Sequence, residues 1–392
     1  MTGKLEHVVV VGYGRSAVAK SGKKGALRNL HPVEMGGMVL KGILEKIPAL
    51  VPEEIDDIIV GCAQQELSQA FNMGRLVGAV AGLPESVPGM TVNRFCASGL
   101  QSVALAASQI ECGMADCIVA GGIESMSSIP IDMEKMKQII SPWIWENARE
   151  QYMAMGITAE NVASRYGIAR EEMDAFAVKS HEKALRAQAE GRLNQSVIPL
   201  PGLDADGNEI TFDQDQGIRP GTTVESLSKL DPCFKKDGTV TAATSSQTSD
   251  GAGFVVLMSE KKAEQLGIEP IAKFIGFAVA GCEAAYMGLG PMYAVPKVME
   301  KTGLALDDMD VIELNEAFAS QAIVCMKELG LDPDKVNPNG GAIALGHPLG
   351  ATGGILSCKI LDELQRTGKR YGLVTMCIGG GMGAAGIYEM CG

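Results

Sequence analysis

Three residues of the sequence, Cys96, His347 and Cys377, have side chains and local settings suited to acyl-transfer chemistry. A thiol that loses its proton is a strong nucleophile, and a neutral imidazole can take that proton. A second thiol can donate or accept a proton elsewhere on the same substrate. The three residues therefore predict a thiol nucleophile with two proton-transfer partners, provided that the fold brings them together.

Cys96 lies in the segment NRFCASGLQSVALAA, between a β-like run at 90–95 and an expected helix at 98–111. Leu100, Val103 and Ala107 recur at helical spacing and mark the apolar face of that helix. A helix N-terminus favours a thiolate, because its free N–H groups and its dipole stabilise negative charge. The alternative is a small buried cysteine with no chemical role.

Of the four histidines, only His347 lies in a Gly/Pro-rich segment, NPNGGAIALGHPLGATGG, ahead of an expected helix at 350–365. Glycine permits close backbone approach in such a segment. Cys377 lies in MCIGGGMGAAG, at the end of an expected strand at 371–378. Glycine-rich backbone after a strand can expose N–H groups to an anion. Each residue, taken alone, is also compatible with a purely structural role in its turn.

Asn315 follows an expected strand at 311–314, in the segment NEAFASQA. Ligand sites of α/β proteins form at the ends of parallel strands. An amide at such a position can hold a water or an oxyanion. The neighbouring Glu316 has the alternative role of capping the helix that follows.

The elements that must position these residues follow from the hydrophobic pattern. Short apolar runs alternate with helical patterns, which predicts βαβ units and a mostly parallel sheet. Further strands are expected at 7–11, 55–60, 116–120 and 271–279, and further helices at 33–47, 170–190, 291–302 and 317–329. The strand at 371–378 is the last clear one. Residues 121–243 are richer in charge and turn residues, with loops expected at 199–202 and 204–208, which indicates an insertion.

The chain carries the same local order twice. Around Cys96 and again around His347, a turn leads to a helix, the helix to a strand, and the strand to a Gly-Gly pair. The repetition predicts two similar α/β halves.

Composition excludes several classes of protein. The formal charge of −13 and the 5% aromatic content argue against nucleic-acid binding. No apolar run is long enough for a membrane helix. Ten cysteines in 392 residues are too few for a disulfide scaffold, and they include no CxxC pair, which argues against a structural zinc site. They favour a reducing compartment, and because no targeting signal is found, a cytoplasmic location is expected.

Two other functions compete with thiol catalysis. The run VVVVGYGRSA contains Gly12-x-Gly14-x-x-Ala17, which is typical of dinucleotide binding when a helix begins at the second glycine. The sequence SGKKG at 21–25 breaks any such helix, so hydride transfer is not favoured. A non-catalytic module that binds coenzyme A or lipid remains an alternative, although it needs neither thiol.

Four segments, NRFCASGLQSVALAA, NEAFASQA, NGGAIALGHPLGATGG and CIGGGMGAAG, resemble the signature segments of thiolases in order and spacing. The resemblance implies an α/β fold, the thiolase-like five-layer αβαβα sandwich of two similar halves. Residues 1–120 plus 244–268 would form the N-terminal half and 269–392 the C-terminal half. An inserted loop domain at 121–243 would bind coenzyme A. Thiolases are homodimers or homotetramers built as dimers of dimers.

The resemblance also implies a role for each residue of the site. Cys96 matches the acyl-accepting nucleophile and His347 the base that activates it. Cys377 matches the acid that protonates the departing acetyl-CoA carbanion. Asn315 matches the residue that holds a water in one oxyanion hole, and the N–H groups of Cys96 and Gly379 match a second hole. The implied reaction is ping-pong cleavage of 3-ketoacyl-CoA by coenzyme A, with no permanently bound cofactor and no metal.

Coenzyme A contacts carry over to positions in the insertion and beside the catalytic segments. The matching residues are Arg219, Ser226, Phe234, Ala242, Ser246, Met155, Ala317 and Phe318. Arg219 is the one fixed charge among them, which explains how an acidic chain could hold a polyanion.

The sequence departs from the family at two places. Many short-chain biosynthetic thiolases have a histidine where Ala154 precedes Met155, in a segment that lines the acyl pocket. The region 129–152 carries both tryptophans, Trp143 and Trp145, and is unlike the usual tetramerisation loop. Together with SSQTSDGAG, the first departure favours a degradative 3-ketoacyl-CoA thiolase of fatty acid β-oxidation. An acetyl-CoA acetyltransferase that makes acetoacetyl-CoA is the alternative.

Overall fold

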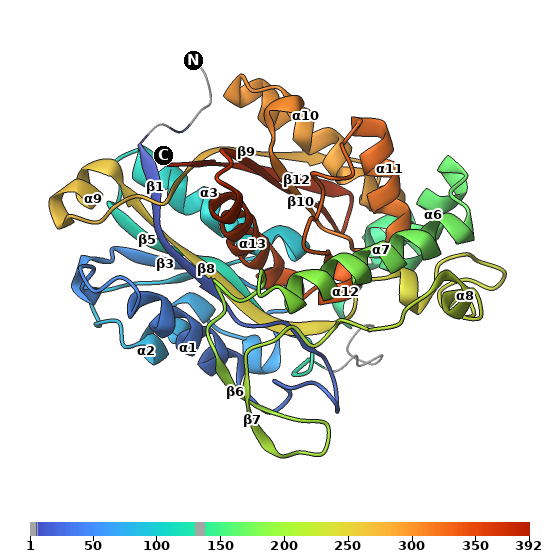
Figure 1. Ribbon diagram of the computed structural model, residues 1–392, viewed down its shortest axis with the longest axis horizontal. Helices are drawn as coiled ribbons and strands as arrows, with labels where there is room; N and C mark the ends of the chain where they lie inside the picture. Colours follow the sequence, from blue (N-terminus) through green and yellow to red (C-terminus); the bar gives the residue numbers. More distant parts are fainter. Residues whose placement is uncertain (1–4, 6, 130–137) are drawn as a thin grey trace.

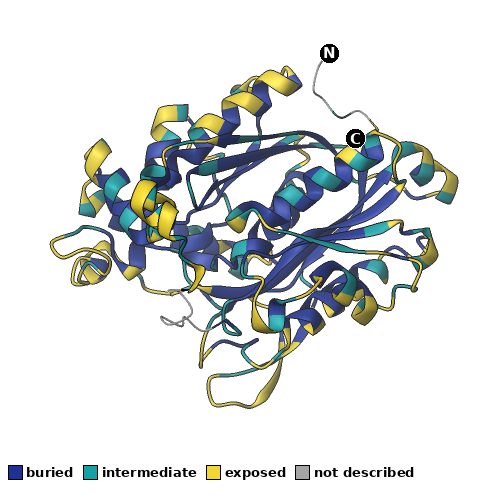
Figure 2. Cartoon of the chain, turned by 180° about the vertical axis from the view of Figure 1, so that it is seen from behind, coloured by how far each residue is buried: buried dark blue, intermediate teal, exposed yellow. Residues whose placement is uncertain are grey.

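The computed structural model describes residue 5 and residues 7–129 and 138–392. Two mixed half-sheets lie one above the other, with two helices between them and further helices outside each (Figure 1). The expected five-layer αβαβα sandwich is thereby confirmed. Figure 2 shows most strands of the two half-sheets and the central helices buried and the outer faces of the covering helices exposed.

The N-terminal half-sheet has the strand order β4-β3-β5-β8-β1. β3 pairs in parallel with β4 and β5, whereas β8 is antiparallel to both β5 and β1. A short β2 also pairs with β8. The strands are β1 (Val8–Arg15), β2 (Ala19–Lys20), β3 (Asp57–Gly61), β4 (Met90–Val92), β5 (Cys117–Ser125) and β8 (Ser249–Ser259).

The C-terminal half-sheet repeats the pattern in the order β10-β11-β12-β9. β10 and β11 are parallel, β12 is antiparallel to β11 and β9, and an isolated parallel bridge joins Ile312 to Val336 in the place of β4. Its strands are β9 (Ala272–Gly281), β10 (Val311–Leu314), β11 (Tyr371–Ile378) and β12 (Met382–Met390). The expectation of two similar halves is confirmed. The halves join edge to edge through two residue pairs between β1 and β9.

Three expectations about the strands were wrong. The sheet is not mostly parallel, because β8 and β12 each close a half by pairing antiparallel. β12 was missed because its sequence, MGAAGIYEM, is rich in glycine and alanine. The segment expected as a loop at 199–202 instead enters β6 (Leu200–Leu203), which forms a hairpin with β7 (Glu209–Phe212) despite its proline.

The central layer consists of α3 (Ser98–Glu111) and α13 (Thr352–Thr367), which contact each other and strands of both half-sheets. Their N-terminal turns touch through glycines. A Cβ on Gly353 would lie 2.1 Å from the Leu100 nitrogen, and one on Gly99 would lie 2.8 Å from the Gly350 oxygen. Only residues without side chains allow this approach, which brings the loops that precede the two helices together.

Other helices cover the outer faces. α1 (Pro32–Leu44) and α2 (Met73–Ala81) lie on the N-terminal half, and α10 (Gly290–Thr302) and α11 (Ala319–Leu329) on the C-terminal half (Figure 1). α9 (Glu260–Leu266) follows β8. The chain continues as β strand through Gly12 and Gly14, so no helix begins there and the dinucleotide interpretation fails.

The inserted region packs mainly against the C-terminal half, through contacts of α6 and α7 with α11. Part of the segment compared with the tetramerisation loop, 130–137, lies outside the described residues; Trp143 and Trp145 are exposed on α5. The helices of the region are α5 (Pro142–Asn147), α6 (Met155–Tyr166), α7 (Arg170–Ala189) and α8 (Val224–Leu227). Within the described ranges, no helix has the length and apolar character needed to cross a membrane.

Candidate active site

Cys96 lies in a tight turn that links β4 to α3. Phe95 adopts a left-handed conformation with φ of 45°, which is strained for a bulky residue. Two side chains hold the turn: Asn93 accepts a hydrogen bond from the Phe95 N–H at 2.9 Å, and the Ser98 hydroxyl donates to the Phe95 carbonyl at 2.7 Å. The expected strand-to-helix turn is present, and it fixes the position of the thiol.

The surroundings of Cys96 keep it a neutral thiol in the free protein. Burial raises its pKa to about 11, although the nearby backbone N–H groups of Gly379 and of Cys96 itself oppose the shift. The negative charge of Glu124 adds to the rise. The N–H groups act in the direction expected from the sequence, since they favour the thiolate, but desolvation outweighs them.

His347 is 5% exposed and lies just before the short helix η8 (Leu349–Ala351). The Thr352 hydroxyl donates to the Pro348 carbonyl at 3.2 Å, so it can only accept from Nδ1 of His347, 2.6 Å away. Nδ1 therefore carries the proton, and Nε2 is left with a free electron pair. Burial lowers the pKa of His347 to about 4, which keeps the ring neutral and ready to act as a base at neutral pH.

Asn315 lies at the end of β10 and faces His347. Its Nδ2 is 3.4 Å from His347 Nε2, whereas its buried Oδ1 has no hydrogen-bond partner in the structure. The backbone N–H of Asn315 donates to the Thr375 carbonyl on β11 at 3.0 Å. The arrangement leaves a polar amide and a histidine nitrogen side by side at the edge of the sheet, as an oxyanion or a water would require.

Cys377 is buried near the end of β11, two residues before Gly379. Its sulfur lies 3.5 Å from Oε1 of Gln321, to which it donates. Burial raises its pKa well above the ordinary value, and the neighbouring Cys96 thiol adds to the rise. Cys377 is therefore held as a proton donor close to Cys96.

Packing brings the three segments together. The short helix η3 (Phe95–Ala97) contacts both η8 and β11. The buried Glu124, at the end of β5, accepts a hydrogen bond from the Gly350 N–H and another from the Ala63 N–H, both at 2.8 Å. This carboxylate ties the loop after His347 to the N-terminal half, where Cys96 lies.

Most of the expected coenzyme A contacts lie beside Cys377. Phe234 and Phe318 stack edge to face with ring centroids 6.0 Å apart, and the Ser246 N–H donates to the Ala317 carbonyl at 2.9 Å. Met155 covers Gly379, since a Cβ there would lie 3.5 Å from its sulfur. Ala242 is exposed at the start of a short helical turn nearby. These residues form one wall next to the thiols.

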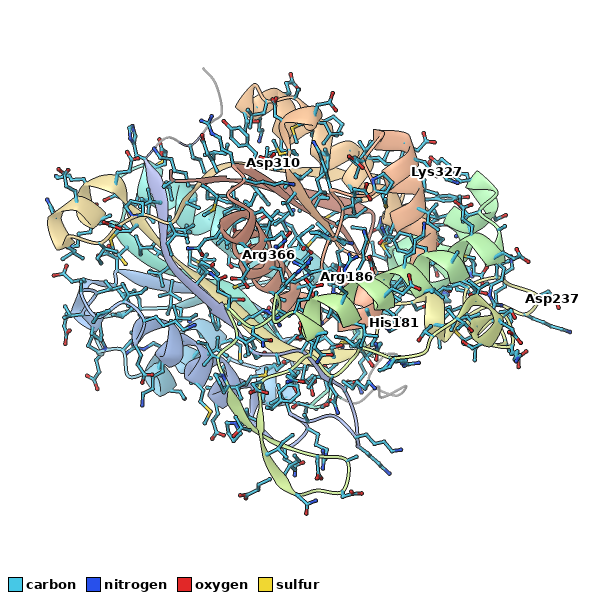
Figure 3. All side chains as sticks on the ribbon, in the orientation of Figure 1. His181, Arg186, Asp237, Asp310, Lys327 and Arg366 are labelled. Atoms are coloured by element: carbon cyan, nitrogen blue, oxygen red, sulfur yellow. The ribbon has the colours of Figure 1, made fainter. Side chains whose placement is uncertain are left out.

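Ser226 and Arg219 lie in more exposed positions. The Ser226 hydroxyl donates to the Thr223 carbonyl within its own helix cap, so its side chain is already used locally. Arg219 is exposed, and its backbone N–H donates to His181, which Figure 3 labels on α7. Burial first, and then the charges of Arg219 and Lys20, lower the pKa of His181 to about 4. Basic groups thus gather there in an acidic chain.

Thr352 and Lys20 are among the residues of the site that the sequence motifs did not indicate. Thr352 was read only as part of a glycine-rich stretch, although a hydroxyl five residues after a histidine is a candidate partner for its ring. Lys20 ends β2, directly before the helix-breaking segment 21–25, and no motif of the sequence marks it. Within 7–129 and 138–392, no three His, Cys, Asp or Glu side chains come together in a way that could hold a metal ion.

The chain is similar to known proteins in sequence and in structure. Residues 8–261 match the family model "Thiolase, N-terminal domain" and residues 268–390 match "Thiolase, C-terminal domain". A 3-ketoacyl-CoA thiolase of Bacillus subtilis is 49% identical, with 99% of this chain and 100% of that protein aligned. The human peroxisomal 3-ketoacyl-CoA thiolase is 46% identical over 98% of this chain and 91% of that protein.

Two solved structures are similar over 99% of this chain and the whole of theirs. Human mitochondrial 3-ketoacyl-CoA thiolase superposes with a TM-score of 0.91 at 36% identity. The Bacillus anthracis acetyl-CoA acetyltransferase superposes with a TM-score of 0.90 at 38% identity.

Proposed function

This chain belongs to the thiolase family, and from that premise we propose that it cleaves 3-ketoacyl-CoA with coenzyme A, releasing acetyl-CoA and a shortened acyl-CoA. The observation that carries the proposal is the convergence of the segments that hold Cys96, Cys377 and His347, which brings the two thiols close together. The relatives named 3-ketoacyl-CoA thiolase favour this reaction over acetoacetyl-CoA synthesis.

In the first half of the reaction, His347 Nε2 takes the proton of Cys96, and the sulfur attacks the 3-keto carbon. The oxyanion that forms is stabilised by hydrogen-bond donors such as those of Asn315 and of the Cys96 and Gly379 N–H groups. The Cα–Cβ bond then breaks, and its electron pair stays on Cα as the enolate of acetyl-CoA. Cys377 donates its proton to that carbon, and acetyl-CoA leaves.

In the second half, coenzyme A gives its thiol proton to the Cys377 thiolate and attacks the acyl-Cys96 thioester. The tetrahedral intermediate collapses and expels the Cys96 sulfur, which recovers its proton from His347. Both residues then return to their starting protonation states. The neutral ring and the neutral thiols of the free protein are the states from which this sequence begins.

The chain length of the substrate is the first test of this proposal. Thiolysis is expected for 3-ketoacyl-CoAs of four carbons and upward, with activity rising beyond four carbons. The reason is that residue 154, directly before Met155, is a small alanine, whereas many short-chain thiolases have a histidine there. Initial rates are measured at saturating coenzyme A across the series. Activity confined to acetoacetyl-CoA would assign the chain to the acetyltransferase branch instead. Absence of thiolysis on every substrate would contradict the proposed function as a whole.

Coenzyme A is proposed to lie across the region 121–243, with its pantetheine along Ser246, Phe318 and Met155. Its phosphates reach Arg219, an exposed guanidinium with no acidic partner among the described residues. An Arg219→Ala variant is expected to raise the KM for coenzyme A roughly 3- to 10-fold with little change in kcat, since an exposed charge pair contributes only a small binding free energy. The effect should shrink in 0.5 M salt. Lys261→Ala, an exposed charge on α9, is the control; an equal effect there would contradict a specific contact.

We further propose that two copies of the chain pair through the edge strand β4. β4 is the last strand of its half-sheet, and exposed apolar side chains flank it: Leu67 is 53% exposed, Phe71 90% and Phe95 48%. An open edge with apolar neighbours fits a second copy of the same strand. Sedimentation of the wild-type protein should give at least twice the mass of one chain. The Phe71→Asp variant should shift the measured mass toward that of one chain, whereas Met114→Asp should leave it unchanged. A wild-type mass of one chain contradicts this pairing.

A cytoplasmic location is proposed from the thiols. All ten cysteines, each of which the structure describes, are free. Free thiols persist in a reducing compartment. Some relatives are peroxisomal, so fractionation of the source cells decides between the two compartments.

A further inference from the structure

The amide of Gln321 is the polar side chain in contact with the Cys377 thiol. Gln321 is fully buried in the first turn of α11. Its Oε1 accepts from the Cys377 sulfur at 3.5 Å and from the Ala317 N–H at 3.1 Å. The Ala317 N–H can only donate, so it fixes which end of the amide faces the thiol.

The other end of the amide has no hydrogen-bond partner among the residues that the structure describes. Nε2 of Gln321 is buried and makes no hydrogen bond in the structure, which is costly for an amide. Gly288 packs against the stem of the side chain: a Cβ at that position would lie 2.5 Å from the Gln321 Cβ. The side chain is therefore held at its base, while its amide keeps one unused donor next to the reacting thiol.

The reaction makes two opposite demands on Cys377. Before the carbon–carbon bond breaks, the residue must be a thiol with its proton held ready for the carbanion. After it has protonated Cα, it is a thiolate in an apolar enclosure, where an anion without a donor is strongly disfavoured. One residue that accepts in the first state and donates in the second would serve both.

We propose that Gln321 is the positioning residue of Cys377. Its Oε1 accepts a hydrogen bond from the thiol, and its Nε2 donates a hydrogen bond to the thiolate that forms when the thiol proton moves to Cα. The inference rests on the proposed function. A turn of the amide exchanges its two ends, at the loss of the Ala317 hydrogen bond, so the acceptor orientation is the resting one. Cys377 is protonated again when it takes the thiol proton of coenzyme A, and the amide of Gln321 then turns back.

A purely structural role is the competing explanation. Gln321 occupies the third position of α11, and a glutamine there commonly reaches back to cap the backbone before the helix. Gln321→Glu separates the two roles. A carboxylate still accepts from the Ala317 N–H, so the cap survives, but it has no proton to donate and repels a thiolate. Gln321→Met removes both abilities at similar volume.

Two partial reactions report the result. Exchange of the acetyl group between acetyl-CoA and labelled coenzyme A needs only Cys96 and His347, whereas exchange of the acetyl-CoA methyl protons for deuterium needs Cys377. Both Gln321 variants should lose about 10- to 100-fold in proton exchange and in thiolysis, while acetyl exchange stays within about 2-fold, as expected for loss of a hydrogen bond to a charged group. Cys377→Ala gives the reference for complete loss.

Ser320→Ala is the matched control, since the Ser320 hydroxyl is equally buried in the same turn but donates to the Ala159 carbonyl. Wild-type proton exchange in Gln321→Glu would overturn the proposal, because Gln321 would then serve only as a cap of the helix. Equal loss of both partial reactions, or an equal loss in Ser320→Ala, would also overturn it. A wild-type protein without thiolysis would instead defeat the proposed function, and the partial reactions would tell the two failures apart.

Discussion

Replacing Cys96 with alanine is expected to lower thiolysis by at least about 10⁴-fold, because no other thiol lies at the strained turn where two N–H groups meet the reacting atom. The fold should persist, since the variant removes a single sulfur atom and keeps the backbone of the turn. Wild-type protein incubated with acetyl-CoA alone should gain one acetyl group, and peptide mapping should assign it to Cys96.

The control for this prediction is Cys112→Ala, which removes an exposed thiol on the far end of α3 and should keep wild-type activity. Acetylation at a different cysteine, or appreciable turnover by Cys96→Ala, would remove Cys96 from the mechanism. The same map also shows whether Cys377 is modified, which the proposed proton-transfer role does not allow.

Replacing His347 with alanine is expected to lower kcat/KM by about 10²–10⁴-fold, the usual loss when a general base is removed. Acetyl exchange should fall with thiolysis, since both begin by deprotonating a thiol. The variant Thr352→Val supplies a graded comparison, because it keeps the ring but removes the acceptor that holds the proton on Nδ1. A wild-type rate in His347→Ala would contradict the assignment.

The pH profile gives a sharper check on His347. Burial lowers its pKa to about 4, and only the neutral form can take a proton, so this group should leave kcat/KM unchanged from pH 8 down to about pH 5. Activity should fall only as pH drops through the lowered pKa. Rates are measured after return to neutral pH as well, to separate titration from unfolding. An inflection near pH 6.5 that disappears in His347→Ala would show an ordinary histidine.

The local elements could be predicted because their signals are local. The helix at 98–111 and the strands at 311–314 and 371–378 have the bounds expected from periodicity. β12 could not be found in this way, since a strand covered by β11 and β9 on both edges needs little β-branched sequence to be stable. The antiparallel partnership of β8 also escaped, because it depends on the long insertion that separates it from β5.

The site divides in the same manner. Cys96 stood out because it lies between a strand and a helix, and His347 and Cys377 because their segments are rich in glycine. The structure brings the three segments into contact. The protonation states could not be read from the sequence. The neutral thiol of Cys96 reflects burial by residues from both halves, and the ring proton of His347 is fixed by a single hydroxyl. Such effects depend on three-dimensional packing rather than on local spacing.

The strand order has a consequence for how the protein is made. β8 lies between β1 and β5, yet residues 126–248 must be synthesised after β5 before it emerges from the ribosome. At roughly 5–20 residues per second, this takes on the order of ten seconds. During that time β5, an entirely buried strand in the finished protein, has an open edge. The nascent N-terminal half therefore depends on protection of that edge until its last strand arrives.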